Sequence, residues 1–243
     1  MKKILFIVLP AVSGLLALLL LFYSTETLSK KASSQGITKP TIILDAGHGE
    51  PDGGTRGVGG ESEKDINLSI TLKTAQLLTL YGFDVMLTRP GDDGIYSNNA
   101  KTIRQKKVED MHKRLAIVRD RPNSLFVSIH QNYYEGYSVG CQIFYSPNNE
   151  ESKLLAQTVQ DTFKNLLQPD NNRKIKASDR SLYLLHNIKS PAIMVECGFL
   201  SDVKEARLLN TEDYQRQVAF CITSGLTEYI GAPAQITSVN EGN

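Results

Sequence analysis

The sequence predicts an α/β fold, in which a mostly parallel, twisted sheet carries helices on both faces of a single domain. Short apolar, β-branched runs recur at 41–44, 124–129 and 192–195, and such runs are typical of strands buried on both faces. Stretches with helical apolar spacing lie between them, and this alternation favours a parallel sheet that helices cover on both sides. The 243 residues are enough to bury one substantial core.

Each element is assigned from its local pattern. Helices are recognised by apolar residues one turn apart, such as Ile66 and Ile70. The expected elements are strands at 41–44, 83–88, 124–129, 139–145 and 192–195, and helices from Asp65 to the Tyr81-Gly82 pair and at 103–119, 151–167, 203–209 and 214–229. The polar stretches 90–100 and 168–180 are expected to be loops, and the short apolar run 182–185 fits neither type of element.

The first residues have a different character from the rest of the chain. Lys2 and Lys3 precede an apolar run from Ile4 to Tyr23, close to the ~20 residues needed to span a bilayer. No A-x-A cleavage site follows, which favours an uncleaved anchor over a removed signal peptide, and the two lysines place the following chain outside the cytoplasm. The chain is therefore expected to divide into an N-terminal membrane anchor or signal segment (1–24), a polar linker (25–39), a folded domain (40–231) and a polar tail (232–243).

Composition argues against two other classes of protein. Lys+Arg number 27 and Asp+Glu 26, for a net charge of +1, so there is no electrostatic reason to expect a nucleic-acid partner. The three cysteines, Cys141, Cys197 and Cys221, are an odd number and lie in apolar surroundings. We expect buried free thiols and no disulfide framework.

Polar residues follow three of the predicted strands. His48 comes shortly after the first strand in a glycine-rich loop, His130 follows the strand at 124–129, and Glu196 follows the last strand. The carboxyl ends of parallel strands meet at one edge of the sheet, so we expect these residues to lie together, with Glu63 at the start of the next helix. Two histidines and a carboxylate are a typical catalytic zinc set that leaves one position for water, and a further glutamate could accept the water's proton.

Each of these signals also has an ordinary interpretation. His48 could be a solvated histidine in a turn, and the polar residues could be unrelated loop residues, since no H-x-x-x-H pair links the histidines. The glycine-rich loop matches neither a dinucleotide-binding loop nor a Walker loop. The position of Glu196 favours the functional interpretation. A carboxylate within the apolar stretch 191–200 is costly to bury unless it meets a cation or holds a proton.

Four motifs carry a resemblance to a known family. They are Asp45-x-Gly47-His48-Gly49, Glu63-Lys64-Asp65-x-Asn67-Leu68, Ser128-Ile129-His130-x-Asn132 and Val195-Glu196-x-Gly198-Phe199-Leu200-Ser201. In this order they resemble the zinc-dependent N-acetylmuramoyl-L-alanine amidases (amidase type 3), over about residues 40–230. The basic segment 101–114 and the stretches 140–145 and 182–185 are similar to the germination-specific spore-cortex amidases.

The resemblance implies a catalytic domain that binds one Zn²⁺ through His48, Glu63 and His130 and uses Glu196 as its catalytic carboxylate. Glu61 lies two residues away and is the rival ligand, but Glu63 stands in the motif. The implied reaction is hydrolysis of the amide between N-acetylmuramic acid and the L-alanine of peptidoglycan stem peptides, in spore-cortex maturation with muramic-lactam formation or in cell-wall remodelling.

The candidate substrate-binding residues are Asn132, Arg89 and Arg114. Either arginine could hold a stem-peptide carboxylate, or could be an ordinary surface arginine. The expected partners are peptidoglycan and, through residues 1–24, a membrane, and an accessory protein could activate or recruit the enzyme. The expected location is extracytoplasmic, in the cell wall or spore cortex.

Three alternative functions remain open from the sequence. The chain could be another extracytoplasmic zinc hydrolase, such as a peptidase or a sugar deacetylase. It could also be a non-catalytic wall-binding regulatory module, although the presence of all four site residues argues against this. A cysteine hydrolase that uses Cys197 is the weakest alternative, because no base is visibly paired with that thiol.

Overall fold

The computed structural model of the protein describes residues 39–231. The predicted anchor or signal segment (1–24), nearly all of the predicted linker (25–39) and the predicted tail (232–243) lie outside this range. Among the described residues, none of the helices is both long enough and apolar enough to cross a membrane. The elements are β1 (Thr41–Ala46), α2 (Glu63–Leu80), β2 (Val85–Leu87), α3 (Ile103–Arg119), β3 (Ser124–Asn132), β4 (Gln142–Tyr145), α4 (Glu151–Leu166), β5 (Lys176–Ala177), α5 (Tyr183–Asn187), β6 (Ala192–Phe199), α6 (Val203–Leu209) and α7 (Glu212–Gly231).

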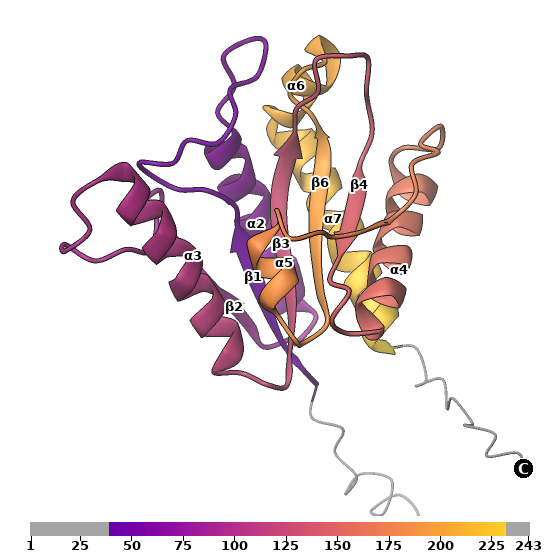
Figure 1. The fold of residues 1–243 in the computed structure, drawn as a ribbon. Helices are drawn as coiled ribbons and strands as arrows, with labels where there is room; N and C mark the ends of the chain where they lie inside the picture. Colours follow the sequence, from indigo (N-terminus) through magenta and orange to yellow (C-terminus); the bar gives the residue numbers. More distant parts are fainter. Residues whose placement is uncertain (1–38, 232–243) are drawn as a thin grey trace, which may run out of the picture. The chain divides into compact units, whose positions relative to one another are not determined.

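The strands form one six-stranded sheet in the order β2-β1-β3-β6-β4-β5. Figure 1 labels β1, β2, β3, β4 and β6. β2, β1, β3 and β6 run parallel to one another, β4 is antiparallel to β6, and β5 is parallel to β4. The connection 133–141 between β3 and β4 contains no helix to carry the chain back along the sheet, so β4 runs in the opposite direction. The predicted mostly parallel sheet is confirmed.

Helices cover both faces of the sheet, as predicted (Figure 1). Ile42 and Leu44 of β1 belong to the core that also contains residues of α2, α4 and α7. Ile43, between them, belongs to the core on the opposite face, with Leu115 of α3 and Leu185 of α5. This alternation follows from the two-residue period of a strand, which sends successive side chains to opposite faces.

Two strands are longer than the sequence predicted, and the difference changes the position of two site residues. β3 continues to Asn132 and β6 to Phe199, so His130 and Glu196 lie within strands and not after their ends. The predicted boundaries came from the ends of apolar runs. Backbone pairing does not depend on side-chain polarity and continues through the polar residues.

The other boundary differences are smaller. Helix α2 begins at Glu63 instead of Asp65, and the unassigned run 182–185 contributes to the short helix α5. β5 lies inside the stretch predicted as a loop at 168–180, where Lys176 and Ala177 pair with the end of β4. Both β5 residues are exposed at the edge of the sheet, so no apolar alternation marks them as a strand.

Candidate metal centre and active site

The carboxyl edge of the parallel strands brings the four candidate residues together. His130 of β3 and Glu196 of β6 are direct partners in the register of the two strands. His48 follows β1 by two residues, and Glu63 is the first residue of α2. The site is therefore assembled from three neighbouring strands and one helix N-terminus, as the strand-end argument predicted.

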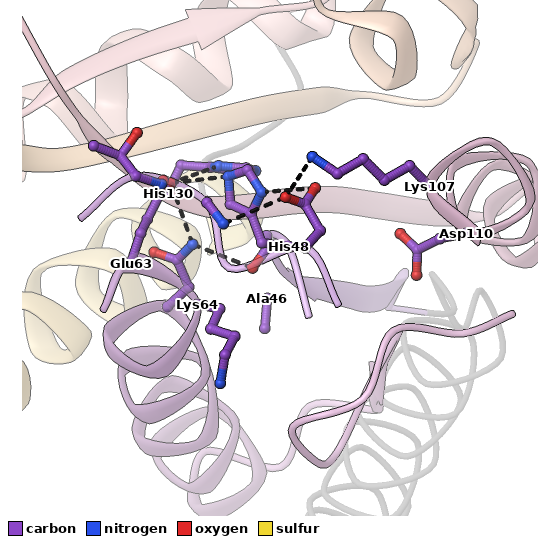
Figure 2. Close-up of polar contacts among 12 residues, drawn as sticks. Ala46, His48, Glu63, Lys64, Lys107, Asp110 and His130 are labelled. Carbon is purple, nitrogen blue, oxygen red and sulfur yellow. Dashed lines mark hydrogen bonds and ion pairs between the residues drawn. The ribbon is translucent and has the colours of Figure 1, made fainter. Parts of the chain in front are cut away.

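Glu63 lies at the centre of this group. Its Oε1 is 3.1 Å from Nε2 of His48 and 3.2 Å from Nδ1 of His130. Figure 2 shows both imidazole rings next to the Glu63 carboxylate. One potential ligand atom from each residue lies within 4.8 Å of the others, so the three residues can hold a metal ion.

Backbone groups fix the Glu63 carboxylate in place. The N–H of Thr55 donates to Oε2 at 2.7 Å, and the N–H of Gln131 donates to Oε1 at 3.2 Å. Glu63 is only 2% exposed. Glu61, the rival residue, lies outside this group and accepts a hydrogen bond from the N–H of Gly59 at 2.9 Å.

The loop that carries His48 depends on two glycines. His48 itself has a φ of 63°, in the left-handed region that a residue with a side chain rarely adopts. A Cβ on Gly47 would lie 2.2 Å from the His130 ring, and a Cβ on Gly54 would lie 2.5 Å from Oε2 of Glu63. Glycine at these positions therefore lets the loop approach the two other ligand candidates.

Burial and hydrogen bonding have opposite effects on the charges of this group. Burial lowers the pKa of His48, but hydrogen bonds to Asp52 and Glu63 outweigh this effect and raise the pKa to about 9. Burial raises the pKa of Glu63, but hydrogen bonds to His130 and His48 outweigh it and hold the pKa well below its usual value. A metal ion that binds here replaces protons, so its affinity depends on pH.

Asp52 and Lys107 extend the site beyond the residues that the sequence identified. Nδ1 of His48 lies 3.1 Å from Oδ2 of Asp52, and Nζ of Lys107 lies 2.7 Å from Oδ1 of the same carboxylate. Lys107 belongs to α3, so this chain of contacts (Figure 2) connects α3 to His48. A carboxylate on the outer nitrogen of a metal-binding histidine fixes the ring's orientation and tautomer. No local sequence signal marked this pair, because residues four apart are neighbours on a helix and His48 and Asp52 lie on a loop.

Arg114 is buried and supports the His48 loop from α3. It is 0% exposed and donates to Oδ1 of Asp45, to Oδ2 of Asp110 and to the backbone carbonyls of Ala46 and His48. Burial lowers the pKa of Arg114, but the charges of Asp45 and Asp110 outweigh it, so the guanidinium stays charged. The N–H groups of its guanidinium are therefore bonded to oxygens of the protein itself.

Arg89 is buried in a similar way, at 1% exposed. It donates to the backbone carbonyls of Ala46, Gly47 and Lys64. Both guanidinium groups are enclosed and bonded within the protein, which does not favour the prediction that Arg89 or Arg114 binds a stem-peptide carboxylate, and that prediction stays untested. The third candidate, Asn132, is half-buried, and its side-chain oxygen accepts from the N–H of Tyr133.

Glu196 carries a carboxylate oxygen that the fold leaves unpaired. Its Oε2 is buried and has no hydrogen-bond partner among residues 39–231. Burial raises the pKa of Glu196 to about 7, the charge of Glu63 also raises it, and the charges of His130 and His48 lower it. A carboxylate with a pKa near neutrality can accept and release a proton in neutral solution. An unpaired buried oxygen is costly for stability, which indicates a functional role.

A cavity of about 330 Å³ opens beside His48 and His130. Its other walls include Tyr96 from the loop before α3, Lys106 from α3 and Tyr183 from α5. A larger hollow of about 880 Å³ lies between α2 and α7 and includes none of the four candidate site residues. We assign the chemistry to the smaller cavity, because His48 and His130, two of the three candidate metal ligands, line it.

The three cysteines are free and buried, as expected. Burial raises the pKa of Cys141 and Cys197 well above the usual thiol value and that of Cys221 to about 11. The nucleophile of a cysteine hydrolase is a thiolate. The buried thiols therefore argue against the cysteine-hydrolase alternative.

Comparisons with known proteins agree on one family. Residues 42–228 match the family model described as N-acetylmuramoyl-L-alanine amidase. The germination-specific N-acetylmuramoyl-L-alanine amidase of Bacillus subtilis is 34% identical over 221 residues, which are 89% of this chain and 91% of that protein. The solved CwlD amidase of Clostridioides difficile, in complex with the GerS lipoprotein, matches with a TM-score of 0.75 and 42% identity, over 79% of this chain and 98% of that one. The amidase AmiC2 of Nostoc punctiforme matches with a TM-score of 0.67 and 27% identity, over 81% and 100%.

Proposed function

Because the chain belongs to the N-acetylmuramoyl-L-alanine amidase family, we propose that it hydrolyses the amide between the lactyl group of N-acetylmuramic acid and the L-alanine of peptidoglycan stem peptides. The observation that carries this proposal is the contact of His48 and His130 with Glu63 next to the buried, unpaired carboxylate of Glu196. This arrangement combines a place for a metal ion with a group that can move a proton.

The proposed metal is one Zn²⁺ per chain, held by His48, Glu63 and His130. Two imidazoles and one carboxylate are a donor set typical of catalytic zinc, and Oε1 of Glu63 already faces a nitrogen of each histidine. When bound, zinc lowers the pKa of water and polarises a carbonyl oxygen. Asp52 would hold the His48 ring, and the backbone N–H groups of Thr55 and Gln131 would hold Glu63.

Glu196 would carry the proton during the reaction. Its carboxylate accepts a proton from water as the oxygen attacks the amide carbon, and it then delivers this proton to the departing nitrogen. The carbon–nitrogen bond breaks, which leaves a carboxylate on the lactyl group and a free amine on L-alanine. The pKa of about 7 suits a group that first accepts and then donates a proton.

The cellular setting is a further part of the proposal. We place the protein outside the cytoplasm, attached to a membrane or secreted through residues 1–24, with residues 40–231 as its catalytic domain. The likeness to the germination-specific amidase of Bacillus subtilis supports a role in the spore cortex. The CwlD amidase was solved with the GerS lipoprotein, which supports an accessory protein as a partner here.

The products released from purified peptidoglycan test this function. We expect intact stem peptides with a free L-alanine amine, no release in the presence of a chelator, and one zinc per chain by elemental analysis. Peptide fragments without a free L-alanine amine would indicate a peptidase, and acetate would indicate a sugar deacetylase. Binding without any product would indicate a wall-binding module, and each of these three results would overturn the proposal.

A further inference from the structure

Lys106 is a cation at the cavity beside His48 and His130 that has no acidic partner. Within residues 39–231 no carboxylate lies within ion-pair distance of its ammonium, whereas the adjacent Lys107 is bound to Asp52. Its Nζ instead lies 4.6 Å from the centroid of the Tyr96 ring. Lys106 is half-buried and lines the wall of the cavity.

The wall that carries Lys106 and Tyr96 is fixed before any ligand arrives. The loop with Tyr96 is attached to α3 by hydrogen bonds on both sides of the ring. The N–H of Ile95 donates to Oδ1 of Asp110 at 2.7 Å, and the N–H and hydroxyl of Ser97 donate to the two carboxylate oxygens of Glu109, both at 3.0 Å. Asp110 in turn is held by Arg114. A preformed wall loses little conformational entropy on binding, which favours affinity.

We propose that Lys106, oriented by Tyr96, binds a carboxylate of the stem peptide and so makes the enzyme prefer acidic stem peptides. This inference rests on the proposed amidase function. The second residue of the stem, a D-glutamate, carries a free α-carboxylate one residue beyond the L-alanine whose amide is cleaved. Lys106 lines the same cavity as His48 and His130, so a carboxylate close to an amide that lies at the metal centre is within the cavity that Lys106 borders.

The other lysine and the arginine at the cavity already have acidic partners within the protein. Arg114 is enclosed and bonded to Asp45 and Asp110, and Lys107 neutralises Asp52. Among residues 39–231, Lys106 is thus the cation of this wall that makes no ion pair. A carboxylate that meets it makes a charge-assisted hydrogen bond, which is stronger than a neutral one.

The experiment compares two soluble muropeptides that differ only at the D-glutamate, one with the free α-carboxylate and one with its amide. Initial rates of L-alanine amine release are measured for the full-length wild type and for Lys106→Met, Lys106→Arg and Lys164→Met. Lys164 is exposed on α4, so its change removes the same charge away from the site. Lys106→Gln is a second neutral variant.

For Lys106→Met we expect kcat/KM on the acidic substrate to fall about 3- to 30-fold, mainly through KM, between the ranges for exposed and buried charged contacts. The amidated substrate should lose little, Lys106→Arg should recover most of the preference, and Lys164→Met should behave as wild type. A structural role for Lys106 would instead lower kcat/KM equally on both substrates, and that result would overturn the inference alone. If the wild type releases no amine from either substrate, the proposed function fails and the inference fails with it.

Discussion

The two faces of the sheet differ in how far their apolar character extends towards the carboxyl edge. On the face covered by α2, α4 and α7, the central strands stay apolar through Leu44, Ile129, Val195 and Cys197, and the polar Gln131 follows only at the end of β3. On the face covered by α3 and α5, Ile43, Phe126 and Met194 give way along the same strands to Asp45, Ser128, His130 and Glu196.

This difference separates the part of the molecule that stabilises the fold from the part that supports the site. The apolar face can be packed by side chains of the right volume alone. The polar row needs specific partners, and it obtains them because Arg114 and Ser128 both donate to Asp45. Residues of the polar row should therefore affect activity, metal binding and stability separately, whereas residues of the apolar face should affect stability alone.

The largest effect should follow from Glu196→Gln, which keeps the size of the side chain and removes the proton acceptor. We expect the rate of stem-peptide release to fall by roughly 10²–10⁴, the range of general acid–base catalysis. Zinc content and the unfolding transition should stay as in the wild type. A variant that loses its metal together with its activity would show that Glu196 is a ligand and not the proton carrier.

The next largest effect should follow from the loss of the buried ion pair between Arg114 and Asp45, on the face covered by α3 and α5. Arg114→Met leaves Asp45 buried without its partner, which should lower the free energy of unfolding by about 3–5 kcal/mol. Urea-induced unfolding measures this loss of free energy. Arg119→Met, an exposed change on the same helix, should stay within about 0.5 kcal/mol of wild type. Equal unfolding midpoints for the two variants would contradict the role given to Arg114.

The same pair should make the protein sensitive to acid. Burial raises the pKa of Asp45, but the charge of Arg114 and hydrogen bonds from Ser128 and Thr88 outweigh it and hold the pKa below its usual value. This stabilisation is present above the unfolded-state pKa and is lost as the pH falls through the lower folded-state pKa. The free energy of unfolding, measured across acidic pH, should depend less steeply on pH for Asp45→Asn than for wild type. Parallel curves of this free energy against pH would refute the attribution to Asp45.

A smaller effect should follow from Asp52→Asn, which removes the carboxylate from the outer nitrogen of His48. Metal affinity should weaken about 10- to 100-fold, as is usual for the partner of a ligating histidine. Competition with a chromophoric chelator measures the affinity without reference to activity. Lys113→Met is the matched control on α3, because Lys113 pairs with Glu109 and not with Asp52. If Asp52→Asn left the metal affinity unchanged, Asp52 would have no role in the metal site.

The smallest effect is expected on the apolar face. Ile193→Val removes one buried methylene and should lower the free energy of unfolding by about 0.5–1.5 kcal/mol. Its zinc content and its rate of peptide release should match wild type, as measured in the assays above. A lower rate with full metal content would mean that the two faces are not separable in function.

The fold and the centre of the site could be predicted because both follow from local patterns. Apolar runs mark β1, β3 and β6, and a polar residue shortly after such a run must lie near the carboxyl edge of a parallel sheet. His48, Glu63, His130 and Glu196 could be expected together for this reason, before any distance was known.

The remainder depends on contacts between distant residues, which no local pattern contains. Arg114 lies in a strongly basic helix and has the appearance of a surface residue, but Asp45, far away in the sequence, makes its burial favourable. Asp110 at i,i+4 from Arg114 was the only local indication. Lys107 likewise acquires its role from Asp52, and β5 is a strand only because β4 lies beside it.

The direct pairing of His130 with Glu196 has a consequence for how this site can vary. The spacing between the two residues is set by the hydrogen-bond ladder between β3 and β6, and a shift of one residue would turn one of them to the opposite face. His48 and Asp52 lie on a loop, which tolerates insertions and changes of sequence far better than a central strand. The β3–β6 pair is thus fixed by the sheet, whereas most loop positions near the site are not. Directed evolution of this scaffold towards new amide substrates should therefore leave that pair untouched and accumulate changes in residues 90–107 and in residues 47–62 other than Gly47, His48, Asp52 and Gly54.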